Sequence, residues 1–185
     1  MMVFEFQELN LKGAFLINNF YAGDNRGGFT KSFEKDIFSE AGIIFTLNET
    51  FTSRSMKNVI RGLHFQTHNP QAKLVSVLSG KVWDVIVDLR KDSTTFMQWT
   101  ARELSAENHL SFYIPRGFAH GFATLEDETV MLYQCDGKYH KEHDTGIRFN
   151  DPKFEISWPI DEKLAILSER DLSLPNFSEC HIFMA

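Results

Sequence analysis

The stretch KLVSVLSGKVWDVIVDLR (Lys73–Arg90) decides the fold class of this chain. It contains two runs rich in Val, Ile and Leu, at Leu74–Leu78 and Lys81–Leu89, which are typical of β-strands. Ser79 and Gly80 lie between the runs, and a pair of this kind suits a two-residue hairpin turn. We therefore predict an antiparallel hairpin at this point of the chain.

The second of these runs presents two different faces, because side chains alternate along a strand. Val82, Asp84, Ile86 and Asp88 share one face, and Trp83, Val85, Val87 and Leu89 share the other. A face that mixes apolar residues with Asp84 is either solvated or lines a polar cavity.

The rest of the chain continues the β pattern, with 18 phenylalanines and many short Val, Ile and Thr runs between turn residues. Helical periodicity is best developed from Lys31 to Ala41, where Phe33, Ile37 and Phe38 fall on one face. The spacing suits a mainly β sandwich or barrel of the jelly-roll kind, with a few short helices. Further strands are predicted at Gly13–Asn18, Val59–Gln66, Met97–Glu103, Leu110–Ile114, Gly121–Thr124 and Val130–Cys135.

Size and charge limit the classes of function. A chain of 185 residues that is 43% hydrophobic can bury one sizeable core, so we expect a single domain over residues 1–185. The net charge of −6 disfavours binding to nucleic acid or to a membrane surface, because both need a basic face. A few arginine and lysine side chains still suffice for a small anionic ligand.

The two cysteines, Cys135 and Cys180, are isolated and lack the spacing of a disulfide framework. We interpret both as reduced thiols. The N-terminal residues lack the pattern of a signal peptide, and no apolar run approaches the roughly 18 residues that a membrane span needs. These features predict a cytoplasmic protein.

A PxGxxH element at Pro115–His120 raises the question of a metal site. Metal-binding cupins usually pair such an element with an earlier HxH. Here the earlier element is HFQ (His64–Gln66), so the second side chain is an amide, and the charge that follows is Lys73. A protonated lysine repels a divalent cation and cannot ligate it, so we expect no bound metal.

Two histidines lie close together in RGLHFQTHNPQAK (Arg61–Lys73). His68 stands beside an Asn-Pro turn and is interpreted as a surface residue. A lone histidine on a strand, such as His64, is by default a core residue with satisfied hydrogen bonds. The basic residues at both ends of this stretch, with His120, favour a polar cavity around it instead.

A cavity that holds histidine, lysine and tyrosine suits proton transfer next to a ketone. His64 could remove a proton from the carbon beside the carbonyl, and Lys73 could stabilise the enolate oxygen. Reprotonation from the opposite face requires a second acid, for which Tyr133 and Tyr139 are the candidates. Taken in isolation, the sequence favours a core position with a hydrogen-bonded hydroxyl for each tyrosine.

Seven motifs occur along about residues 11–175: DNRGGF (Asp24–Phe29), VIRGLHFQ (Val59–Gln66), KLVSVLSGKVWDVIVDLRKDS (Lys73–Ser93), IPRGFAHGF (Ile114–Phe122), LYQCDGKY (Leu132–Tyr139), HDTGIRFNDP (His143–Pro152) and LSERD (Leu167–Asp171). Together and in this order they resemble the dTDP-4-dehydrorhamnose 3,5-epimerase family. RGLHFQ followed by KLV and PRGFAHGF is the most specific part of the resemblance.

The resemblance implies a cupin jelly roll, also called a double-stranded β-helix. It implies a homodimeric, metal-free protein that needs no redox cofactor and acts on a nucleotide-linked 4-keto-6-deoxy sugar. His64 matches the family's base, and Asp171 matches the aspartate that orients it. Tyr133 matches the acid on the other face of the sugar, and Lys73 matches the group that stabilises the enolate. The expected pathway is deoxysugar biosynthesis for surface polysaccharide, such as lipopolysaccharide O-antigen.

Three residues depart from the family pattern around the expected nucleotide pocket. Lys31 stands where the family usually has Glu, and Glu49 and Phe51 stand where it usually has Gln and Asn. We expect these residues and Gln66 to contact the substrate, so they could change the nucleotide from dTDP to CDP. The resemblance itself implies substrate contacts at Arg26, Phe29, Arg61, His120, Tyr139, Asp144 and Arg170.

Several alternatives stay open. The enzyme could invert C3, C5 or both, and relatives with the same catalytic residues stop after one centre. A 3,4-ketoisomerase would use the same enolate, but such relatives usually carry an HxH pair that His64–Gln66 lacks. A non-catalytic nucleotide-sugar binding cupin would keep the pocket without turnover. A metal-dependent cupin dioxygenase is disfavoured by the missing second histidine and by Lys73.

Overall fold

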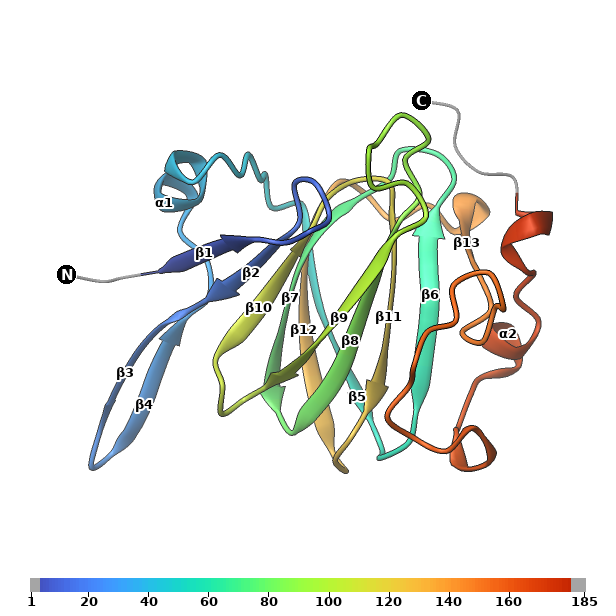
Figure 1. Ribbon diagram of the computed structural model, residues 1–185. Helices are drawn as coiled ribbons and strands as arrows, with labels where there is room; N and C mark the ends of the chain where they lie inside the picture. The colour runs from blue at the N-terminus through green and yellow to red at the C-terminus, as the bar shows by residue number, and fades with distance from the viewer. Residues whose placement is uncertain (1–3, 181–185) are drawn as a thin grey trace.

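Two antiparallel β-sheets face each other in the computed structural model, which describes residues 4–180 (Figure 1). The mainly β architecture predicted from the sequence is therefore confirmed. The first sheet has six strands in the order β1 (Glu5–Glu8), β2 (Phe15–Asn18), β10 (Leu110–Ile114), β7 (Ala72–Ser79), β12 (Thr129–Asp136) and β5 (Glu49–Ser55).

The second sheet has five strands, and it supplies the opposite side of the core. Between the sheets, Val75 from β7 and Phe112 from β10 pack with Ile86 and Phe122 from the second sheet, and all four are buried. The strand order is β13 (Asp144–Gly146), β6 (Ile60–Gln66), β11 (Phe118–Thr124), β8 (Lys81–Asp88) and β9 (Trp99–Ser105).

The predicted hairpin at Ser79–Gly80 is wrong, although both of its strands exist. β7 pairs with β10 and β12, whereas β8 pairs with β9 and β11, so the short turn carries the chain from one sheet to the other. Gly80 turns with a φ of 76°, a left-handed conformation that favours glycine. Alternation of apolar residues identifies strands, but the two strands here pack through their faces instead of pairing through their edges.

The other predicted strands all occur, and Leu110–Ile114 is reproduced residue for residue as β10. The predicted helix at Lys31–Ala41 is too long, because α1 covers only Lys35–Glu40 and Lys31 ends a strand. Its apolar face is correct, since Phe38 is buried in a cluster with neighbouring aromatic residues. The remaining helices are short, as predicted: α2 (Glu169–Leu172) and 3₁₀ turns at Lys141–His143, Glu162–Leu164 and Phe177–Glu179.

A two-stranded hairpin, β3 (Phe20–Asp24) and β4 (Gly27–Lys31), extends away from both sheets (Figure 1). Most of its side chains are exposed, and the ring of Tyr21 stacks on His109 with 3.9 Å between centroids. The sequence did not predict this hairpin, because its glycine-rich strands have no alternating apolar pattern.

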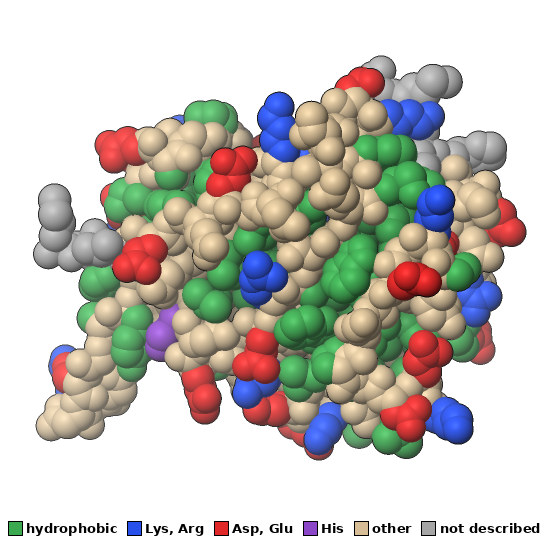
Figure 2. Space-filling view, viewed as in Figure 1, with side chains coloured by type: hydrophobic (Ala, Val, Ile, Leu, Met, Phe, Trp, Pro, Cys, Tyr) green, Lys and Arg blue, Asp and Glu red, His purple; other side chains and the backbone are tan. Residues whose placement is uncertain are grey.

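The chain after β13 covers the outer side of the five-stranded sheet. Phe154 packs there with partly buried Trp83, Trp99 and Phe177, and the space-filling view shows apolar side chains gathered over this region (Figure 2). The sequence leaves the tail after about Leu174 open between wrapping the body and contacting a dimer partner; as far as residue 180 it packs on the body, and residues 181–185 lie outside the described part.

The two cysteines are unpaired: Cys135 is buried and Cys180 is partly buried. Within residues 4–180, none of the helices has the length and apolar character that crossing a membrane requires.

Candidate active site

A cavity of about 500 Å³ lies between the two sheets and brings most of the predicted site residues together. Strands β6 and β11 line it from the five-stranded sheet, and β5, β7 and β12 line it from the six-stranded sheet. The predicted residues in its lining are His64, Lys73, Tyr133, Glu49, Phe51, Arg61, Gln66, His120, Tyr139, Asp144 and Arg170.

His64 is tied to Asp171 by a hydrogen bond of 2.5 Å between Nε2 and Oδ1. Asp171 lies in α2, where the Ser168 hydroxyl accepts a hydrogen bond from its backbone N–H. Burial acts to raise the pKa of Asp171, but its hydrogen bond to and charge attraction from His64, with smaller effects of Ser168 and Arg170, lower it overall. The ionised carboxylate can only accept, so Nε2 of His64 donates and Nδ1 carries the lone pair.

Lys73 enters the cavity from β7, on the sheet opposite His64. Burial lowers the pKa of its ammonium group, and the nearby Cys135, Asp144 and Asp84 oppose this shift. Lys73 has no hydrogen bond or ion pair with another side chain in the described part of the chain. Its N–H donors are therefore available to an oxygen in the cavity.

Tyr133 comes from β12, also on the sheet opposite His64. Its ring is stacked on Phe51 with 4.7 Å between centroids and 11° between planes. Its hydroxyl lies 3.5 Å from the hydroxyl of Ser53. Burial raises the pKa of Tyr133 strongly, so the phenol stays protonated at neutral pH.

His120 forms a second histidine–carboxylate pair, deeper in the cavity. Its Nε2 lies 3.0 and 2.9 Å from the two carboxylate oxygens of Asp84, which is completely buried. Burial raises the pKa of Asp84, and His120 and Lys73 partly offset that effect. The sequence left Asp84 open between a solvated face and a cavity lining. Its position behind His120 was missed, although its polar side chain on an otherwise buried face was a signal.

The rim of the cavity carries a cluster of three predicted residues. Arg170 Nη2 lies 2.7 Å from Asp144 Oδ2, and the hydroxyl of Tyr139 donates to the same oxygen at 3.0 Å. A substrate phosphate could compete for the guanidinium of Arg170, because arginine binds carboxylates and phosphates in the same way.

Gln66 lies in the lining, but its amide is already fully bonded to backbone. Its Nε2 donates to the carbonyls of Asn69 and Lys138, each at 3.1 Å, and its Oε1 accepts from the N–H of His140 at 2.5 Å. The amide therefore has a structural role, and the predicted substrate contact of Gln66 stays a prediction. Gln66 holds the loop that carries Tyr139.

Arg26, Phe29 and Lys31 do not line the cavity of their own chain. They lie on the β3–β4 hairpin, where Arg26 pairs with Asp24 at 2.6 Å and Lys31 pairs with Glu34. Their predicted contacts with the substrate stay predictions.

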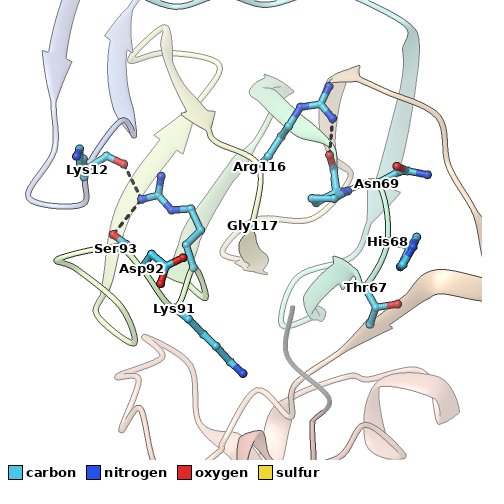
Figure 3. Close-up of a pocket in the computed structure, with 11 residues that line it drawn as sticks. Lys12, Thr67, His68, Asn69, Lys91, Asp92, Ser93, Arg116 and Gly117 are labelled. Carbon is cyan, nitrogen blue, oxygen red and sulfur yellow. Dashed lines mark hydrogen bonds between the residues drawn. The ribbon is translucent and has the colours of Figure 1, made fainter. Parts of the chain in front are cut away.

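A second cavity, of about 800 Å³, contains none of the predicted site residues. It is formed by loops at one end of the sheets and includes exposed His68, which agrees with the predicted surface position (Figure 3). Arg90 in this cavity is paired with Asp88, and Arg116 is bonded to the Pro70 carbonyl and to a carboxylate. Its arginines thus serve the structure, and the smaller cavity is the better candidate for an active site.

The model of the family described as dTDP-4-dehydrorhamnose 3,5-epimerase matches residues 8–179. The chain belongs to the dTDP-4-dehydrorhamnose 3,5-epimerase family. The resemblance expected from the seven motifs is therefore confirmed.

Relatives of this epimerase family match along nearly the whole chain. The dTDP-4-dehydrorhamnose 3,5-epimerase of Methanothermobacter thermautotrophicus is 42% identical over 186 residues and covers 100% of both chains. The crystal structure of the enzyme from Elizabethkingia anophelis has a TM-score of 0.90 and 43% identity, covering 95% of this chain and 97% of that one.

A third relative was solved with a ligand. The dTDP-6-deoxy-D-glucose-3,5-epimerase of Legionella pneumophila, in complex with dTDP-4-keto-L-rhamnose, has a TM-score of 0.92 and 39% identity, covering 96% of this chain and 94% of that one. These epimerase structures confirm the predicted cupin jelly roll. Within residues 4–180, no group of three His, Cys, Asp or Glu side chains is arranged to hold a metal, and the metal-free site stays a prediction.

Proposed function

We propose that this chain inverts C3, C5 or both in a dTDP-linked 4-keto-6-deoxyhexose, by proton removal and return through an enolate. The observation that carries the proposal is the placement of His64 and Tyr133 on opposite sheets across one cavity. Inversion at a carbon requires removal of the proton from one face and delivery to the other, so two opposed groups are needed.

His64 is the proposed base. The ionised Asp171 fixes the ring and stabilises the positive charge that forms when Nδ1 takes a proton. The α-proton of a ketone is acidic enough for this histidine–carboxylate pair, provided that the enolate oxygen is stabilised.

Lys73 is the proposed partner of that oxygen, since its ammonium group is enclosed by the cavity and has no competing ion pair among the described residues. A lowered pKa makes its N–H groups stronger donors to the developing enolate. Tyr133 is the proposed acid for the opposite face, and its raised pKa keeps the proton in place until the enolate forms. None of these steps calls for a redox cofactor or a metal.

The nucleotide diphosphate is proposed to lie along the rim, where Arg61 and Arg170 supply guanidinium groups. His120, Tyr139 and Asp144 are the further proposed contacts. The dTDP-linked sugar is the first choice because the relatives are named for dTDP substrates, including one solved with dTDP-4-keto-L-rhamnose.

We further propose a cytoplasmic homodimer in deoxysugar biosynthesis for surface polysaccharide. The projecting hairpin with Arg26 and Phe29 supports the dimer, because these two matched substrate residues do not reach the cavity of their own chain (Figure 1). In a dimer, the hairpin of one copy could complete the cavity of the other.

The direct test is incubation with dTDP-4-keto-6-deoxyglucose in deuterated water, followed by NMR. Deuterium at C3 and C5 supports double epimerisation, and deuterium at C3 alone indicates a mono-epimerase. Ligand binding without exchange at either centre, for the dTDP and the CDP sugar alike, would remove the enzyme proposal and leave a binding protein.

The dimer has its own test. A His64→Ala copy with an intact hairpin is mixed with a copy that carries Arg26→Ala and Phe29→Ala but an intact cavity, under conditions that exchange subunits. Activity that rises on mixing supports a hairpin acting on the partner. Activity equal to the sum of the separate samples contradicts it.

A further inference from the structure

We propose that the inward face of strand β5 positions both tyrosines of the cavity, and that Glu49 and Phe51 act through these tyrosines and not by reading the nucleotide base. The inference rests on the proposed epimerase function. It concerns residues that depart from the family pattern, and it assigns them a different role from the one the sequence suggested.

Glu49 is bonded to the protein through both of its carboxylate oxygens. Oε1 accepts the backbone N–H of Tyr139 at 2.7 Å, and Oε2 accepts from the amide of Gln71 at 3.4 Å. Tyr139 in turn donates its hydroxyl to Asp144 at the rim. A carboxylate engaged in this way fixes the position of Tyr139 at the rim, and both of its oxygens already accept hydrogen bonds from the protein.

The loop that carries Tyr139 is held at four successive backbone positions. Gln71 donates to the carbonyl of Gly137 at 2.9 Å, and Gln66 binds the carbonyl of Lys138 and the N–H of the residue after Tyr139. Glu49 supplies the remaining contact, at Tyr139 itself. Side chains from three different strands or loops therefore fix one short segment, which is what precise placement of a rim group requires.

Phe51 acts on the other tyrosine. It lies directly opposite Tyr133 in the pairing of β5 with β12, and the two rings are nearly parallel at 4.7 Å. Phe51 remains 48% exposed, so its ring is not there to fill the core. Its face restrains the Tyr133 ring, and Ser53, two residues along the same strand face, lies next to the hydroxyl.

β5 is the edge strand of the six-stranded sheet and pairs with β12 alone. Glu49, Phe51 and Ser53 alternate with outward-facing threonines, so one strand face reaches the rim tyrosine and the acid tyrosine together. A glutamine at position 49 would offer the same acceptor oxygen to Tyr139. The Glu in place of the usual Gln therefore leaves nucleotide choice unchanged.

The test compares Glu49→Ala, Glu49→Gln, Phe51→Leu and Phe51→Tyr with Thr52→Ala, an outward-facing control on the same strand. Each variant is assayed for KM, for deuterium wash-in and for net inversion, with dTDP and CDP sugars. We expect Glu49→Ala to raise KM about tenfold with little change in kcat, since misplacement of a binding group has effects of this order. Glu49→Gln should restore KM to within about twofold.

Phe51→Leu should lower net inversion about tenfold while wash-in continues, because the acid is displaced and the base is not. Phe51→Tyr keeps the stacked ring and should restore inversion. Circular dichroism and thermal unfolding show whether each variant is folded, and the Tyr and Gln variants remain informative if a smaller side chain disrupts the strand.

A change in the ratio of dTDP to CDP activity in Glu49→Gln would overturn the proposal, because it would mean that the carboxylate reads the base. Equal loss of wash-in and inversion in Phe51→Leu would also overturn it. Failure of the wild-type protein to exchange deuterium would instead remove the proposed function itself, so the two failures are distinguishable.

Discussion

The two walls of the cavity hold their reactive groups in different ways. On one wall, His64 is fixed by a direct ionic hydrogen bond to Asp171. On the other, Lys73 and Tyr133 have no carboxylate partner among the described residues and are governed by burial, with ring stacking added for Tyr133. The wall that carries His64, here called the base wall, thus relies on a charge pair. The wall that carries Lys73 and Tyr133, here called the acid wall, relies on burial.

This difference separates the acid from the base. The pKa of Asp171 is lowered, so the base wall keeps a negative charge that favours proton uptake by His64. The pKa of Tyr133 is raised, so the acid wall keeps its proton. Two environments that move pKa values in opposite directions are what assigns opposite roles to groups in one cavity.

Loss of the base should have the largest effect. We expect His64→Ala to lower deuterium wash-in by about 10²–10⁴-fold at every centre, the usual contribution of a general base. Ligand binding measured by calorimetry should persist, because the rim arginines are untouched. Wash-in at more than about a tenth of the wild-type rate would show that another group removes the proton.

Loss of the acid should affect the second wall alone. Tyr133→Phe keeps the ring and its stacking on Phe51 but removes the hydroxyl, so net inversion should fall about 10²-fold while wash-in continues at a similar rate. The measurement is NMR of both label and configuration in the same sample. Parallel loss of wash-in and inversion would assign Tyr133 a role in proton removal and break the division between the walls.

The sequence identified the reactive groups on both walls of the cavity but not the partners of the polar groups around them. Motif order placed His64, Asp171, Lys73 and Tyr133 correctly in or beside one cavity. What the sequence could not show is which polar groups are already bonded: the Gln66 amide binds the nearby carbonyl of Asn69 and two backbone groups more than 70 residues along the chain, at Lys138 and His140. Such partners depend on tertiary packing and have no local pattern.

The fold shows the same limit. The pattern of apolar residues predicted strands β7 and β8 correctly. It did not show that the short turn between them joins two different sheets. Strand β5, with the sequence ETFTSRS, was not predicted, because an edge strand with exposed polar residues lacks a clear apolar face. The segment that positions both tyrosines was therefore the least visible part of the site.

Removal of the charge behind the base should have a smaller, pH-dependent effect. We expect Asp171→Asn to lower wash-in about tenfold near neutral pH, because the orienting charge is lost while the side-chain shape is kept. The folded-state pKa of Asp171 is depressed, so its stabilising effect exists above the unfolded value of about 3.9 and is lost as pH falls through the folded value.

Denaturant unfolding checks this sign. The difference in free energy of unfolding between wild type and Asp171→Asn should be constant from about pH 8 to pH 5 and should shrink below about pH 4. A difference that grows on acidification would mean that the carboxylate is protonated in the folded protein. It would contradict an ionic hydrogen bond between His64 and Asp171.

The smallest expected effect is on stability, and it separates the walls by sign. Burial lowers the pKa of Lys73, which means that the charged ammonium is disfavoured where it stands. A cationic group whose pKa is depressed in the folded state destabilises that state at every pH below its unfolded pKa.

Lys73→Met should therefore raise the free energy of unfolding near neutral pH by about 1 kcal/mol, although turnover falls. This gain should shrink as pH rises through the unfolded pKa of about 10.4 and disappear above about 11, where the lysine is neutral in both states. Denaturant titrations at two pH values measure it. A loss of stability near neutral pH would show that Lys73 is held by attraction to Asp84 and Asp144, and the acid wall would then be organised by charge pairing like the base wall.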